Sequence, residues 1–391
     1  MGRLQSHNQS HTSSAVQTKA WTSADVETIV LDARNTIPLI KEADVVRIAP
    51  DLDIWDSWPV QNPDGSIAFV DGREFWMALA APAYDDMGRR HDEARIRLLE
   101  NTLAGWIDHG DLLPRDLNPG SREWAGSAIY NAHGNFLTLF FTAAGRSGEE
   151  ERSYEQRIFQ VEASMHVEGG HVRFGEWSEP TECFQADDVH YMRANQKEGK
   201  PGEIKAFRDP AFFLDPRDGQ TYLLFTASVA HSKSAFNGAI GIAQKKESAE
   251  RQWSTLPPLV TADRFNNELE RAHALYHNGQ YYLFWSTQEH VFSPDSPRGP
   301  TGLYGMVADS LLGPYTPLNG TGLVAATPIA EPKQSYSWLV LDTLEVISFI
   351  DFWGLKGRNL ATEPGLARQQ FGGAYAPRFT LRLDGANATI V

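Results

Sequence analysis

The sequence predicts an all-β fold, and a five-bladed β-propeller fits its pattern best. Two observations carry this prediction. Aromatic residues make up 11% of the 391 residues, and the 32 Gly and 22 Pro are typical of many short strands and turns. Short apolar runs rich in β-formers also follow turn dipeptides at long, similar intervals, as in propellers with four-stranded blades.

Four turn dipeptides mark the expected hairpins: Asp71-Gly72, His133-Gly134, Asp218-Gly219 and Asn278-Gly279. Each precedes an apolar strand, as tight hairpin turns do. The glycines lie 62, 85 and 60 residues apart, and a further apolar strand is expected at 345–350. Dividing 391 residues by five gives about 78 per repeat, which suits five blades. An array of β-sandwiches could produce similar turns, so this alternative stays open here.

Little of the chain predicts helix. Residues 89–101 are one candidate, with a charged face expected to be solvated. Residues 145–205 are rich in charge and glycine, and we expect strands joined by long loops there. Residues 1–20 are polar and predict a disordered tail, which leaves residues 21–391 as a single propeller domain.

Composition excludes several classes of function. With 50 acidic and 35 basic residues the net charge is −15, which disfavours nucleic acids and anionic membranes as partners. The single cysteine, Cys183, allows no intramolecular disulfide and no cysteine-based zinc site, and we expect a partly buried thiol. His7 and His11 lie in the polar tail and are not expected to bind metal. This tail lacks the apolar segment of a signal peptide.

A polar cluster precedes each predicted hairpin, on the strand before the turn. The clusters occupy 55–59, 122–127, 207–210 and 268–271. Taken singly, each could be a turn carboxylate or a surface ion pair. Together they place polar residues at equivalent positions where a core strand should be apolar. Because the innermost strands of a propeller line one channel, these residues should converge there.

Converging carboxylates beside aromatic side chains suit glycoside chemistry. A retaining mechanism needs an ionised nucleophile and a protonated general acid about 5 Å apart. Tryptophans offer sugars an apolar platform. Arg208 and Arg271 could hold carboxylates in the ionised state or bind sugar oxygens.

At these residues the chain resembles glycoside hydrolase family 68, which contains levansucrases, inulosucrases and bacterial β-fructofuranosidases. The resemblance runs from Asp53 to about Leu383 through the motifs at 54–65, 122–128, 207–213, 237–241, 268–284, 299–324 and 334–338. It implies a five-bladed propeller with a central funnel-shaped pocket. It also implies cleavage of sucrose through a fructosyl-enzyme, with transfer to sugar acceptors and release of glucose. A chiefly hydrolytic enzyme and a fructan-binding propeller without catalysis are the alternatives.

The resemblance assigns roles residue by residue. Asp56 corresponds to the nucleophile, Asp209 to the transition-state stabiliser and Glu270 to the general acid/base. The positions expected to contact substrate are Trp55, Trp124, Ala125, Arg208, Glu268, Arg271 and Tyr336, together with either Gln288 or His290 on the acceptor side. We expect Arg208 and hydrogen bonds to keep Asp56 ionised while burial keeps Glu270 protonated.

Several positions depart from the family pattern. Many members have Ser at Ala125, where it bonds the nucleophile, and Glu at Thr226, near the sugar subsites. Both changes would favour water over a sugar acceptor. His273 is expected only to pack. Some members bind calcium through an Asp where this chain has Asn267, a poorer ligand for a hard cation, so no cofactor or metal is expected.

The resemblance also bears on partners and location. The expected partners are sucrose and sugar acceptors, with no nucleic acid and no membrane. Short Gram-negative-type members often reach the outside of the cell without a cleaved leader. We expect the same here, with the cytoplasm as the alternative.

Overall fold

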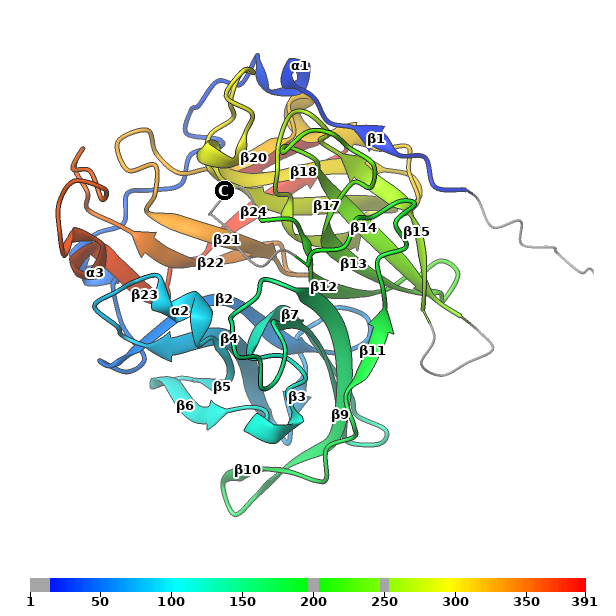
Figure 1. Cartoon of the computed structure of the whole chain (residues 1–391), viewed down its shortest axis with the longest axis vertical. Helices are drawn as coiled ribbons and strands as arrows, with labels where there is room; N and C mark the ends of the chain where they lie inside the picture. The colour runs from blue at the N-terminus through cyan, green and yellow to red at the C-terminus, as the bar shows by residue number, and fades with distance from the viewer. Residues whose placement is uncertain (1–14, 196–203, 247–252) are drawn as a thin grey trace, which may run out of the picture.

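Five innermost strands form a closed ring, which confirms the five-bladed propeller. The computed structural model describes residues 15–195, 204–246 and 253–391. β2, β7, β12, β16 and β21 each contact the next in chain order, and β21 contacts β2. Figure 1 shows the blades following one another round the ring, from the blue and cyan blade I through green and yellow to the orange and red blade V.

Each blade is a small, mainly antiparallel sheet. Blade I contains β2 (Leu52–Gln61), β3 (Phe69–Val70), β4 (Arg73–Pro82), β5 (Arg95–Thr102) and β6 (Gly105–Asp111). Blade II contains β7 (Arg122–Asn131), β8 (Phe136–Ala144), β9 (Gln156–Glu168), β10 (His171–Phe174) and β11 (Thr181–Phe184). Blade III contains β12 (Phe207–Leu214), β13 (Thr221–Ser228), β14 (Gly238–Lys245) and β15 (Trp253–Thr261). Blade IV contains β16 (Glu270–His277), β17 (Gln280–Thr287), β18 (Gly302–Ala308), β19 (Thr316–Pro317) and β20 (Leu323–Ala326). Blade V contains β21 (Ser335–Val340), β22 (Glu345–Phe352), β23 (Phe371–Tyr375), β24 (Phe379–Asp384) and β25 (Asn387–Ile390).

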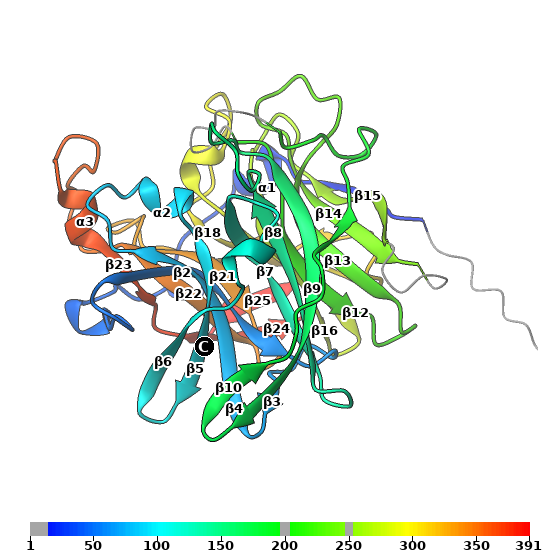
Figure 2. The same cartoon turned by 60° about the horizontal axis from the view of Figure 1, so that its bottom comes forward.

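The four predicted turns join β3 to β4, β7 to β8, β12 to β13 and β16 to β17. Asp71-Gly72 and Asn278-Gly279 have positive φ at both residues, as a two-residue type I′ turn requires. Strands β9 to β11 also confirm that residues 145–195 contain strands joined by loops. Figure 2 shows the β5–β6 and β9–β10 hairpins projecting from one side of the molecule.

The helix predicted at 89–101 is wrong for most of its length. Only α2 (Arg89–Asp92) is helical, and Arg95–Thr102 is β5. Ile96 and Leu98 alternate with charged residues, which suits a half-buried strand. The charges are not simply solvated, because Arg97 pairs across the sheet with Asp108 and Asp111.

The remaining helical segments are short. They are α1 (Ser23–Val26), α3 (Leu366–Gln370) and the 3₁₀ turns η1 (Glu42–Asp44), η2 (Arg115–Leu117), η3 (Glu289–Val291) and η4 (Leu318–Gly320). Within the described residues, none of the helices is long and apolar enough to cross a membrane.

The N-terminal segment packs on the propeller before the expected boundary at residue 21. β1 (Lys19–Ala20) pairs in parallel with β15, and the Gln17 N–H donates to the Leu312 carbonyl. The tail predicted at 1–20 is therefore partly ordered; residues 1–14, with His7 and His11, lie outside the described residues.

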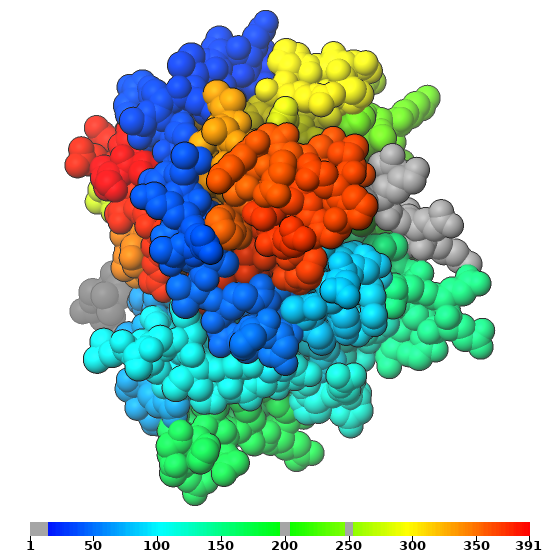
Figure 3. Space-filling view, turned by 90° about the vertical axis from the view of Figure 1, so that its left-hand side faces the viewer, coloured from blue at the N-terminus to red at the C-terminus, as the bar shows by residue number. Residues whose placement is uncertain are grey.

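A buried ion cluster joins the first and last blades. Asp53, at the start of β2, is only 1% exposed and accepts hydrogen bonds from Arg47 and Arg368. Arg47 also donates to the Gly372 carbonyl at 2.9 Å. Figure 3 shows the N-terminal segment, in blue, running between blade V in orange and blade I in cyan. Arg47 in this segment thus links blade V to blade I beside β2.

Candidate active site

All five innermost strands are interrupted at the same level. Their pairing registers shift at Trp55/Ser57, Trp124/Gly126, Arg208/Ala211, Glu270/His273 and Tyr336/Leu339. Such bulges re-aim side chains and are frequent beside active sites. Each shift falls in one of the sequence motifs, so the convergence predicted from the polar clusters is confirmed and extends to blade V.

Four of the bulges hold a non-glycine residue at positive φ. These residues are Asp56 (25°), Asp209 (59°), Arg271 (54°) and Ser337 (58°). Blade II differs because Gly126 follows Ala125. A Cβ atom at Gly126 would lie 1.8 Å from the Phe140 carbonyl oxygen, so only glycine fits. Backbone strain of this kind costs about 1–3 kcal/mol per residue and concentrates at functional sites.

Side-chain hydroxyls on the second strand of one blade bind backbone N–H groups at the bulge of the next. Thr142 accepts from the Asp209 N–H at 2.9 Å, Thr226 from the Arg271 N–H at 3.1 Å, and Ser286 from the Trp338 N–H at 2.9 Å. Since ladder pairing is lost at a bulge, these hydroxyls satisfy buried groups that would otherwise lack a partner.

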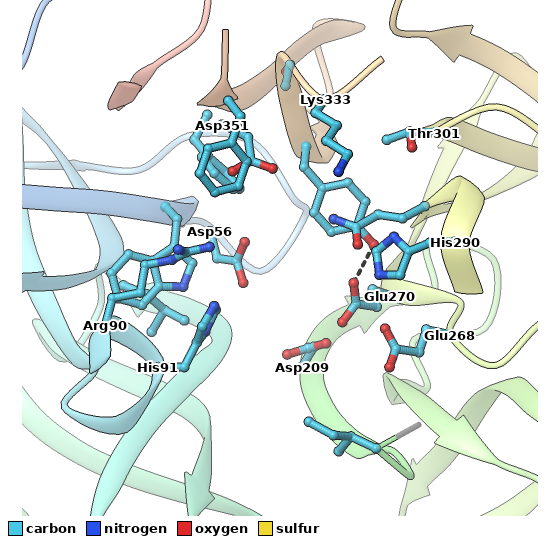
Figure 4. Close-up of a pocket in the computed structure, with 18 of the residues that line it drawn as sticks. Asp56, Arg90, His91, Asp209, Glu268, Glu270, His290, Thr301, Lys333 and Asp351 are labelled. Carbon is cyan, nitrogen blue, oxygen red and sulfur yellow. Dashed lines mark hydrogen bonds between the residues drawn. The ribbon is translucent and has the colours of Figure 1, made fainter. Parts of the chain in front are cut away.

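The bulges surround a central cavity of about 700 Å³. Ten of the predicted residues line it: Trp55, Asp56, Trp124, Arg208, Asp209, Glu268, Glu270, Gln288, His290 and Tyr336. Figure 4 shows Asp56 on one side and Asp209, Glu268 and Glu270 on the other, with open space between them. The carboxylates therefore face a common volume large enough for sugars.

Arg208 organises the acidic side of the cavity. Its Nη2 donates to Glu270 Oε1 at 2.6 Å and lies 3.8 Å from Glu268 Oε2, and its Nε lies 3.6 Å from Asp209 Oδ2. The Tyr336 hydroxyl donates to the other Glu270 oxygen. Both oxygens of Glu270 are thus held, which fixes its orientation towards the cavity.

Burial raises the pKa of two of these acids. The pKa of Asp209 rises to about 6, because desolvation outweighs the opposing charge of Arg208. The pKa of Glu268 rises to about 8, through desolvation and then the nearby charge of Glu270. The same carboxylates hold the Arg208 guanidinium charged and raise its pKa despite burial. Burial and the mutual repulsion of these carboxylates therefore favour a protonated carboxyl on the acidic side of the cavity.

Asp56 is stabilised by different cations from those expected. Burial raises its pKa, and Arg271, then the Ser337 hydroxyl, then Arg90 oppose that rise. The Ser337 hydroxyl lies near Asp56 but has no partner within good hydrogen-bond geometry among the described residues, so the charges of Arg271 and Arg90 are the better supported causes. The expectation that Arg208 keeps Asp56 ionised is therefore wrong, because Arg208 pairs with Glu270 instead.

Comparison with known proteins agrees with this geometry. A levansucrase from Rahnella aquatilis is 31% identical over 405 residues, covering 93% of this chain and 92% of the relative. The solved structure of an inulosucrase from Halalkalicoccus jeotgali bound to kestose has a TM-score of 0.87 and 37% identity, covering 96% of this chain and 95% of that one. The glycoside hydrolase family 68 profile, described as Levansucrase/Invertase, matches residues 10–238 and 232–391. The chain belongs to glycoside hydrolase family 68.

Two predicted family 68 substrate contacts lie outside the cavity wall. Ala125 is fully buried, and its carbonyl accepts from the Thr142 hydroxyl at 3.2 Å. Arg271 lies behind the cavity, where Nη2 donates to the Ser57 carbonyl and the guanidinium lies over Trp58. Neither residue therefore lines the cavity as a sugar contact, whereas the other role expected of Arg271, holding a carboxylate ionised, agrees with its effect on the pKa of Asp56.

Thr226, a departure from the family 68 pattern, also lies behind the cavity. It is fully buried, and its hydroxyl donates to Asp209 Oδ2 at 2.9 Å. The same hydroxyl accepts the Arg271 N–H. Its position indicates that Thr226 holds a catalytic-site carboxylate in place, rather than leaving a gap in a sugar subsite.

Several charged or titratable cavity residues were not found from the sequence. Among them, Arg90 and His91 come from α2, Lys333 from the loop before β21, and Asp351 from β22. Burial, followed by the charge of Arg90, lowers the pKa of His91 well below its ordinary value. Arg90 and His91 belong to the charged run at 89–101, which could have indicated a site. That run was interpreted as a solvated helix face instead.

A lysine side chain lies against Asn267, the position considered for a calcium ligand from the sequence. The Lys205 ammonium donates to Asn237 Oδ1 at 2.8 Å and to Asn267 Oδ1 at 2.9 Å, and also to the Ala235 carbonyl. Among the residues that the structure describes, none form a cluster of three His, Cys, Asp or Glu side chains that could hold a metal ion. Cys183 was expected to be partly buried and is buried, at 5% exposed.

Proposed function

We propose that this chain is a fructosyltransferase of the levansucrase type that cleaves sucrose. The observation that carries the proposal is the arrangement of Asp56 opposite Asp209 and Glu270 across one cavity. The names of the relatives support the substrate class: levansucrases at 31 and 32% identity and an inulosucrase whose structure is bound to kestose.

In the first step, an oxygen of the Asp56 carboxylate attacks the anomeric carbon of the fructosyl unit. The bond from that carbon to the glucosyl oxygen breaks, and Glu270 gives its proton to this oxygen, so glucose leaves. Arg208 and Tyr336 orient Glu270 for this transfer. Glu268 lies near the same Arg208, and burial followed by the charge of Glu270 raises its pKa, which favours a proton within this cluster.

In the second step, a hydroxyl group attacks the same carbon and Asp56 leaves. Glu270, now a carboxylate, accepts the proton of the attacking hydroxyl, which restores the starting state. Asp209 accepts hydrogen bonds from fructosyl hydroxyls and stabilises the oxocarbenium-like transition state of both steps. Trp55 and Trp124 line the cavity and supply an apolar surface for the sugar rings.

The test is incubation with concentrated sucrose while glucose and free fructose are quantified. We expect more glucose than free fructose, because part of the fructosyl groups reaches sugar acceptors. Equal amounts would favour the hydrolytic alternative. Neither sugar would contradict the proposal and favour a non-catalytic propeller.

Asp56→Asn tests the nucleophile. Because covalent catalysis is lost, turnover should fall by about four orders of magnitude or more while the fold is kept. Glucose release is the measurement, with the circular dichroism spectrum as the control for folding. Turnover near that of the wild type would rule out Asp56 as the nucleophile.

A further inference from the structure

Asp351 is a buried acid on the cavity wall for which neither step above has a use. It lies near the end of β22 in blade V and lines the cavity. Its side chain is 8% exposed. Its side chain makes no hydrogen bond to another described residue, and its Oδ1 is closed off without a partner. The other oxygen, Oδ2, is left as the one that can face the cavity.

The surroundings of Asp351 are charged but do not satisfy it. Arg90 on α2, Lys333 before β21 and Asp56 on β2 are the charged groups that act on it. Burial raises its pKa to about 7, against the attraction of Arg90 and Lys333. Figure 4 shows Asp351 on the same side of the cavity as Asp56, away from Glu268 and Glu270.

A buried carboxyl without a hydrogen-bond partner destabilises the fold, and such groups in folded proteins call for an explanation. Asp351 Oδ1 is out of reach of the cavity, but a bound ligand with hydroxyl groups would supply a partner for Oδ2. The ligand that occupies this side of the cavity is the unit attached to Asp56.

We propose that Asp351 is a specificity-determining residue that hydrogen-bonds a hydroxyl group of the fructosyl unit bound at Asp56. The inference rests on the proposed function, since it names the sugar that Asp56 carries. Arg90 supports the role by position: its guanidinium lies over Phe371 and near Trp55, so it fixes the wall between Asp56 and Asp351.

The first experiment measures sucrose kinetics of Asp351→Ala and Asp351→Asn. Loss of a hydrogen bond to a carboxyl should lower kcat/KM at least about tenfold in the Ala variant, mainly through a higher KM. The Asn variant keeps a polar group of the same shape and should recover part of that loss. Unchanged kcat/KM in the Ala variant, with active wild type, would overturn the inference without touching the proposed function.

The second experiment identifies which sugar unit Asp351 contacts. Methyl β-D-fructofuranoside and glucose are used as competitive inhibitors of sucrose turnover. In Asp351→Ala, the inhibition constant of the methyl fructofuranoside should rise by about the same factor as KM, and that of glucose should stay unchanged. A rise for glucose instead would show that Asp351 contacts the leaving side, which contradicts the inference.

Asp215→Asn is the matched control. Asp215 is also buried, at 5% exposed, but it lies outside the cavity and accepts from the Tyr281 hydroxyl at 2.7 Å. This variant should be less stable than the wild type while its KM stays unchanged. Asp351→Ala should show the reverse pattern at pH 7: a raised KM with little loss in urea midpoint. A large loss of stability with a proportional fall in kcat and constant KM would assign Asp351 a structural role only.

Discussion

His273 joins blades IV and V and should make the propeller sensitive to acid. Its Nδ1 donates to the Arg271 carbonyl at 2.9 Å, and its Nε2 accepts from the Val340 N–H at 2.9 Å. The ring is 5% exposed and neutral, because burial lowers its pKa from 6.5 to about 4. Protonation would place a hydrogen on Nε2, opposite the Val340 N–H, and would break the bond between the blades.

The sign and size of the effect follow from this pKa. The unfolded chain protonates His273 near pH 6.5, whereas the folded protein does so near pH 4. Unfolding therefore takes up a proton between these values, and stability falls as the pH falls. A pKa difference of this size corresponds to about 3 kcal/mol of unfolding free energy, fully present at pH 7 and lost by pH 4.

The perturbation is His273→Gln, measured by urea unfolding at pH 7 and pH 4 with tryptophan fluorescence. At pH 7 the variant should be less stable by roughly 2–4 kcal/mol, because two buried hydrogen bonds are weakened or lost. At pH 4 the deficit should shrink by up to about 3 kcal/mol, since only the wild type has lost the His273 contribution. Comparing the two proteins at each pH cancels the titration of all other groups.

His133→Gln, in the exposed turn between β7 and β8, is the control and should match the wild type at both pH values. The reasoning would be refuted by a deficit of His273→Gln that is the same at pH 7 and pH 4. His91, whose pKa is also lowered, contributes an acid-side loss of its own, but this loss is present in both proteins and cancels in the comparison.

Two further predictions concern groups behind the cavity. Thr226→Val removes the donor to Asp209 and leaves the Arg271 N–H unpaired, so urea unfolding should show a loss of roughly 2–4 kcal/mol and sucrose turnover should fall at least about tenfold. Thr226→Ser keeps the hydroxyl and should retain both stability and turnover. Equal behaviour of the Val and Ser variants would contradict the role of the hydroxyl. Lys205→Met removes the donor to Asn237 and Asn267 and should lower the melting temperature, and added calcium should not restore it. EDTA should leave the melting temperature of the wild type unchanged. A fall in the wild-type melting temperature with EDTA would show that the fold needs a metal.

The innermost strands could be predicted from the sequence because polar residues interrupt otherwise apolar strands at similar intervals. Asp56, Asp209 and Glu270 stand where a core strand should be apolar, and turn dipeptides place them in register. The sequence could not predict which of these side chains point into the cavity. A bulge shifts the pattern by one residue, which sends Arg208 into the cavity and Arg271 behind it.

Other cavity residues lacked a usable pattern. Asp351 interrupts an apolar strand once, and a single polar residue in such a run carries no periodicity. Arg90 and His91 lie in a four-residue helix, too short for a 3.6-residue repeat to show. The alternation of Ile96 and Leu98 was the evidence that the following residues form a strand, and it was outweighed by the helix-forming residues around them.

The hydroxyls on the second strands explain how a ring of strained bulges can be stable. At a bulge, a backbone N–H leaves the β ladder, and if it stayed buried and unpaired it would add to the cost of positive φ. Thr142 and Thr226 each pair such an N–H in the next blade, so a bulge residue is held by its neighbour rather than by its own sheet. The geometry of Asp209 therefore depends on the seams between blades II, III and IV. Mutations that loosen a seam should lower activity before they unfold the protein, because the carboxylates keep their mutual positions only while the ring is closed.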